Sequence, residues 1–316
     1  MIPTNRNFWI IYILIMSFFG KIFFTLMFLI DRKTNNIKIF ALLKPFVFQI
    51  TCSNITILVF LVSTLLRNEI VLYIAQCRTH FFAFIYNMIH NISILIIFIK
   101  SKKRLDLTFI LITIIIWICE LIFLRLAKTI IMIDSVRKYY SKFKEESLLN
   151  AYIARSKLDS TKHIFLLLLV VYTSKIFAFK VIRMDSLISK FEFSYDKELH
   201  ELIELIILNE TNLNNFLTIL LLLINIIIIS TCIVYESVTQ RWIALSLMVI
   251  SILHQVQVMY LSFNHFFPIT NKALLFAVTC AYIYGIIAIY NDYKYIGSGL
   301  KGFIIMPNLT YKKRKI

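Results

Sequence analysis

Long apolar stretches alternate with short polar segments along the whole chain. A helix that crosses a hydrocarbon core of about 30 Å needs about 20 apolar residues, and eight stretches are near that length. The pattern predicts an all-α fold, a single polytopic transmembrane helix bundle over residues 1–316 with seven spans, or eight if the first stretch also crosses, and a basic tail at 291–316. The stretches cover residues 8–30, 45–66, 81–99, 107–127, 164–181, 216–236, 242–263 and 273–290.

Two of the polar connections, residues 128–162 and 196–215, are long enough to fold. Both place apolar residues at helical spacing among charged ones. We expect both to form helices that extend a span into the cytoplasm or lie along the membrane surface.

Composition agrees with a membrane protein and narrows its class. Hydrophobic residues make up 59% of the 316 positions, against about 45–50% in soluble domains. The stretch Phe8–Ile30 is longer than the apolar core of a signal peptide, so we interpret it as retained. The net charge of +17 comes from basic residues that flank the apolar stretches, which indicates lipid head groups rather than nucleic acid as the partner. We therefore expect a multi-pass protein of the plasma membrane.

The last apolar stretch carries a recognisable motif. Residues 266–292 read FFPITNKALLFAVTCAYIYGIIAIYND. This resembles the last helix of insect gustatory receptors, which closes on Thr-Tyr, five apolar residues and Gln-Phe. The residues of this chain that bear on the comparison are Ile283, Tyr284, Gly285, Tyr290 and Asn291. Tyr284 matches the family, whereas Ile283, Tyr290 and Asn291 replace the Thr, Gln and Phe.

A second segment supports the same resemblance. Residues 199–235 are similar to the helix that leads into the fifth span of that family, with a Leu-His-x-Leu start, an Asn within the helix and a terminal Tyr. The resemblance implies a chemosensory receptor of the insect gustatory and odorant receptor superfamily, with seven spans and a cytoplasmic N-terminus. Four protomers would surround a cation pore lined by their last helices and opened by a small-molecule ligand. Phe8–Ile30 would then be an extra or interfacial helix.

Polar side chains at membrane depth are costly and are therefore candidates for function. Each can line a cavity that holds ligand or water, or join helices by hydrogen bonds, and the sequence leaves both open. Glu120 needs a partner from another helix, for which Lys175 is a candidate. No metal or cofactor site is indicated. The candidates are Asn87, His90, Asn91, Glu120, Lys175, His254, Gln255 and Gln257.

Two kinds of signal in the sequence bear on membrane orientation, and they conflict. The positive-inside rule favours a cytoplasmic C-terminal tail, whereas the basic run at 100–104 and the receptor resemblance favour an external one. Two glycosylation sequons, at Asn209 and Asn308, are separated by three predicted spans and would face opposite sides. A glycan on either one would therefore decide the orientation.

Other function classes fit the sequence less well. An enzyme needs a nucleophile–base pair or a metal triad, and the apolar stretches contain neither. Secondary transporters favour repeats and helices broken by Gly or Pro, whereas this chain has 5 Gly and 4 Pro. A G-protein-coupled chemoreceptor remains the main alternative receptor class, although its usual Asp-Arg-Tyr and Asn-Pro-x-x-Tyr motifs are missing.

Overall fold

The regular elements are helices throughout the part of the chain that the computed structural model describes. This agrees with the predicted all-α class. The described residues are 48–60, 62–63, 70–100, 114–115, 117–122, 124–126, 129, 146–189, 213–235, 237–264 and 269–297.

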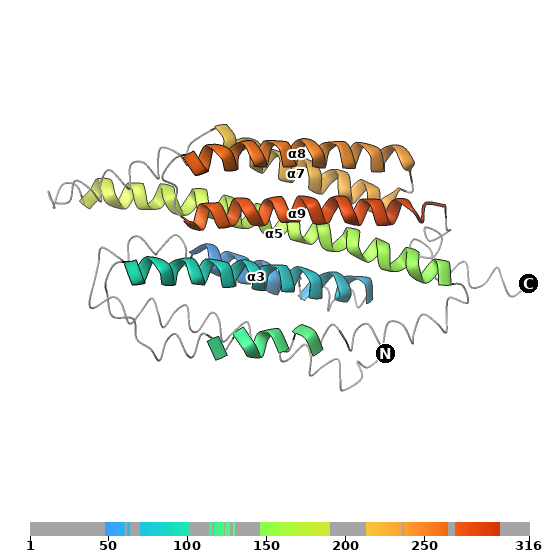
Figure 1. Ribbon diagram of the computed structural model, residues 1–316, viewed down its shortest axis with the longest axis horizontal. Coiled ribbons are helices and arrows are strands. Elements are labelled where there is room, and N and C mark those ends of the chain that lie inside the picture. The colour runs from blue at the N-terminus through green and yellow to red at the C-terminus, as the bar shows by residue number, and fades with distance from the viewer. Residues whose placement is uncertain are drawn as a thin grey trace, which may run out of the picture.

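Five long helices form the described bundle (Figure 1). They are rich in Leu and Ile, contain no Pro and contain a single Gly, which suits uninterrupted helices. A shorter apolar helix, Phe48–Phe60, precedes them, and helical segments lie between residues 114 and 129. The long helices are α3 (Ile70–Lys100), α5 (Glu146–Ser189), α7 (Leu213–Val234), α8 (Val238–Asn264) and α9 (Ile269–Tyr293).

Four segments within the described residues are long and apolar enough to cross a membrane: Asn150–Phe177, Asn214–Val234, Val238–Tyr260 and Leu274–Tyr293. The last three overlap the predicted stretches at 216–236, 242–263 and 273–290. The first overlaps the predicted stretch at 164–181 but begins earlier, inside the connection 128–162. That connection was expected to form a helix that extends a span, and from Glu146 it is continuous with the stretch in α5, one helix of 44 residues.

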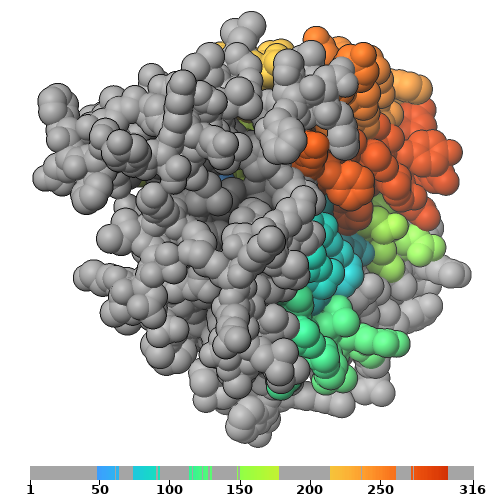
Figure 2. All heavy atoms as spheres, turned by 60° about the vertical axis from the view of Figure 1, so that its left-hand side comes forward, coloured from blue at the N-terminus to red at the C-terminus, as the bar shows by residue number. Residues whose placement is uncertain are grey.

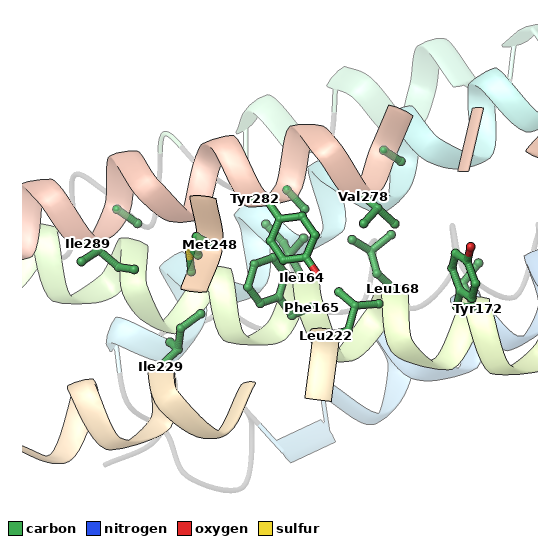
Figure 3. Close-up of a cluster of buried hydrophobic side chains, with 14 of the residues drawn as sticks. Ile164, Phe165, Leu168, Tyr172, Leu222, Ile229, Met248, Val278, Tyr282 and Ile289 are labelled. Atoms are coloured by element: carbon green, nitrogen blue, oxygen red, sulfur yellow. The ribbon is translucent and has the colours of Figure 1, made fainter. Parts of the chain in front are cut away.

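α5 lies at the centre of the described bundle. It packs against α3, α7 and α9, and α8 covers α7 and α9 from the other side. Figure 3 shows side chains from four helices meeting in one core. In it the rings of Phe165 and Tyr282 lie 5.1 Å apart, and Leu168, Leu222 and Met248 are fully buried around them.

The outer faces of α7 and α8 are apolar and largely exposed. Only 33% of the α7 span and 28% of the α8 span are buried, against 56% of the α5 span. Figure 2 shows α8 and α9 side by side at this surface. Large apolar side chains are costly to expose to water but are stable in contact with lipid. Among them are Phe216, Leu223, Ile227, Ile243, Ile250, Leu253 and Val256.

Exposed aromatic side chains indicate the membrane boundaries. Trp242 contacts Tyr293 with ring centroids 6.1 Å apart, and Tyr235 and Tyr290 are exposed near the same end of the bundle. Eighteen residues further along α8, Tyr260 is exposed, at a distance of about 27 Å along the helix. Trp and Tyr favour the two interfaces of a bilayer about 30 Å thick. We refer to the end that carries Trp242 as the Trp242 end.

Candidate functional site

A cluster of buried charged side chains lies just inside the Trp242 end. Arg241 of α8 donates from Nη2 and Nε to Asp292 Oδ2 of α9, at 2.8 and 3.1 Å. Arg155 of α5 places its Nε 3.3 Å from Asp292 Oδ1. The side chains of Arg241 and Asp292 are 1% and 5% exposed. We call these three residues the arginine–aspartate cluster.

The same two arginines close the C-terminal end of α7. Arg155 Nη1 donates to the carbonyl oxygens of Cys232 and Ile233, at 2.7 and 3.1 Å. Arg241 Nη1 donates to the carbonyl oxygens of Tyr235 and Ser237. The last carbonyls of a helix have no partner within it and carry partial negative charge, so cations there are stabilising. The cluster thus ties α5, α7, α8 and α9 together at one point.

Residues 155–163 of α5 form a polar segment inside the bundle. Ser156, Ser160 and Thr161 are fully buried. Ser160 and Thr161 bond carbonyls one turn back in their own helix, which satisfies a hydroxyl without water. Asp159 is also buried and lies 3.3 Å from Lys162 Nζ. This segment packs beside the C-terminal half of α9 and lies within Asn150–Phe177, the stretch of α5 that is long and apolar enough to cross a membrane.

Two residues of the predicted last-helix motif face inward. Tyr284 shares a hydrogen bond of 3.0 Å with Ser160. A Cβ added at Gly285 would lie 2.7 Å from Met248 Sδ and 3.2 Å from Thr161 Cγ2, so glycine permits the close approach of α9 to α8 and α5.

The other two motif residues lie at or nearer the surface. Tyr290 is exposed, with Lys294 Nζ 4.6 Å from its ring, and Asn291 is half-buried. Tyr290 belongs to an exposed stripe on α9, whereas Tyr284 and Gly285 belong to the packed side.

The predicted polar residues of α8 divide in the same way. His254 Nε2 and Gln255 Nε2 lie 3.2 and 3.1 Å from Thr218 Oγ1 of α7. Seven residues further along α7, Asn225 donates to Ser251 Oγ of α8 at 2.9 Å. These contacts join α7 to α8, in agreement with helix–helix hydrogen bonding. Gln257 points away from them and is exposed.

Among the predicted residues near α3, Asn87 donates to Asn54 Oδ1 at 3.2 Å. Glu120 is buried and lies 3.0 Å from His80 Nε2. His80 was not among the predicted residues, and the sequence offered no signal for the pair because the partners are 40 positions apart.

The remaining predicted residues are Lys175, His90, Asn91, Asn209 and Asn308. Lys175 is buried with its Nζ 5.3 Å from the ring of Tyr172. His90 and Asn91 lie within α3, but their side chains lie outside the description, as do Asn209 and Asn308 altogether.

No protein family, curated protein or solved structure matches this chain. The interpretation of its function therefore rests on its own residues and their arrangement.

Proposed function

We propose that this chain is a chemosensory receptor-like protein of the plasma membrane, and that several copies form a ligand-gated cation channel with α9 at the pore. Two kinds of evidence support the proposal. Residues 266–292 and 199–235 resemble insect gustatory receptors, and four described helices have the length and apolarity to span a bilayer. The full set of seven or eight spans is part of the proposal.

The observation that carries the proposal is the division of α9 into two faces. Its inner face is fixed by Tyr284, Gly285 and Asp292. Its outer face carries Phe276, Ile283, Ile287 and Tyr290, all exposed. They follow one another at steps of seven, four and three residues and so form one stripe along the helix. If α9 lines a pore between copies, this stripe is its lining, and Ile283 and Ile287 form a hydrophobic constriction of the kind that gates by dewetting.

Substituted cysteines test the lining. In a background with Cys119→Ser and Cys280→Ser, we expect Ile283→Cys and Ile287→Cys channels to lose current when a water-soluble methanethiosulfonate reagent is applied. Leu253→Cys, exposed on α8, is the matched control and should be insensitive, because lipid covers that face. Equal responses at Ile287 and Leu253, or no response at both Ile283 and Ile287 in a conducting channel, would contradict the proposal.

A secondary transporter is the second candidate, because ionisable side chains lie inside the bundle at membrane depth. Arg155, Asp159 and Asp292 are of the kind that mark solute pathways in transporters. Uptake of a labelled solute without channel-like conductance would favour this class. A response that requires a co-expressed G protein would instead favour the coupled receptor.

A further inference from the structure

Arg78 of α3 is a half-buried cation held against α5 by one hydrogen bond. Its Nη1 donates to Ser156 Oγ at 3.0 Å. The Ser156 hydroxyl donates its own hydrogen bond to the carbonyl oxygen of Ile153, at 2.7 Å. It can therefore only accept a hydrogen bond from Arg78. A guanidinium has five N–H donors, and this bond uses one of them.

No carboxylate in the described part of the chain neutralises Arg78. Three acidic side chains are described there, and each lies against another group: Asp159 against Lys162, Asp292 against Arg155 and Arg241, and Glu120 against the imidazole of His80. Ser156 is also the neighbour of Arg155, so a second guanidinium lies close in sequence to the contact. Among the described side chains between α3 and α5, Arg78 is therefore a cation that no carboxylate neutralises, and it offers directed N–H donors.

We propose that Arg78, oriented by Ser156, forms an anion-binding site between α3 and α5 near the Trp242 end. The ligand chemistry is a phosphate or carboxylate group, which a guanidinium binds through two parallel N–H bonds. Ser156 lies next to Arg155, which reaches the end of α7 beside the exposed Tyr235. The site is thus close to one membrane boundary, where the anion can come from a phospholipid head group or from solution. It does not depend on the proposed channel function.

The test uses the purified full chain in lipid nanodiscs and its thermal unfolding midpoint, Tm. One arm titrates inorganic phosphate into phosphatidylcholine discs, and the other replaces part of the phosphatidylcholine with phosphatidic acid. A ligand that binds the folded state raises Tm. We expect a rise in at least one arm: in the lipid arm if the source is a head group, and in the phosphate arm if it is a solute.

Arg78→Gln should weaken the response about tenfold or more, as expected for loss of a charged hydrogen-bonding partner. Arg125→Gln, at an exposed arginine, should respond like the unchanged chain. If Arg78→Gln does not fold, Ser156→Ala replaces it, because this change removes only the orienting acceptor and should weaken binding severalfold. An unchanged chain that responds in neither arm, or a variant at Arg78 or Ser156 that responds as the unchanged chain does, overturns the proposal.

Discussion

Replacing Asp292 with Asn tests the arginine–aspartate cluster most directly. Asn has nearly the same shape as Asp, so the change removes the charge and leaves the packing of α9 in place. Arg155 and Arg241 then lose the carboxylate that they share. In the closest pair, the side chains of Arg241 and Asp292 are 1% and 5% exposed. The pair is therefore buried, and solvent screens it only weakly.

Removing one partner of a buried ion pair costs about 3–5 kcal/mol, and we expect Asp292→Asn to fall in that range. Arg155→Gln should cost less, because Arg241 keeps Asp292. The main loss is then the pair of hydrogen bonds to the carbonyls of Cys232 and Ile233, about 1–3 kcal/mol for bonds from a charged donor. The order of the two variants follows from the geometry and does not depend on the absolute values.

Thermal unfolding of each variant in the same nanodiscs measures the order, with Lys294→Gln at an exposed position as the control. The double variant Asp292→Asn with Arg155→Gln gives the sharpest result. It should lose less stability than the two single losses added together, because removing one guanidinium relieves part of the uncompensated charge. Strict additivity, or a loss below about 1 kcal/mol for Asp292→Asn, would refute the reasoning.

Three further outcomes follow from the packing of α9. Gly285→Ala should cost about 1 kcal/mol net, because crowding of the new Cβ against the end of the fully buried Met248 side chain exceeds the gain in helix propensity. Combined with Met248→Ala, which itself removes a buried side chain, the total loss should be smaller than the two single losses added together; strict additivity would contradict the close approach. Tyr284→Phe should cost about 1 kcal/mol through the lost bond to Ser160, measured by the same Tm assay. Tyr290→Phe, on the exposed stripe, should leave Tm unchanged, and a loss like that of Tyr284→Phe would show that the two faces are misassigned.

Periodicity and length were enough to predict the helical class and the apolar stretches that overlap α7, α8 and α9. These properties depend on many residues at once, so single polar substitutions do not hide them. For such features, a local pattern is sufficient evidence.

The arginine–aspartate cluster could not be predicted in the same way. Arg155 fell in a predicted polar connection, Arg241 lay one residue before the predicted span 242–263, and Asp292 fell in the predicted tail 291–316. A hydropathy profile scores each residue without regard to its neighbours in space. It therefore places charged residues outside the predicted spans. It cannot show that three of them, 51 to 137 positions apart, neutralise one another within the bundle.

The arrangement of α9 allows a direct test of the membrane orientation of the chain. α9 runs toward the Trp242 end, so the basic tail that follows Tyr293 begins there. Excess Lys and Arg mark the cytoplasmic side, and we therefore expect the Trp242 end to face the cytoplasm. Asn209 precedes the first residue of α7 by four positions, and α7 begins at the opposite end of the bundle (Figure 1).

Expression in cells that glycosylate, followed by enzymatic removal of the glycan, should then give a mobility shift that Asn209→Gln abolishes. Asn308→Gln is the matched control and should leave the shift intact. The opposite result, a shift that depends on Asn308, would place the tail outside, as the gustatory-receptor resemblance implies. It would also mean that the arginines at the Trp242 end serve the cluster they form and do not set the orientation. A buried charge held by Asp292 and helix carbonyls contributes little to the electric field at the lipid head groups.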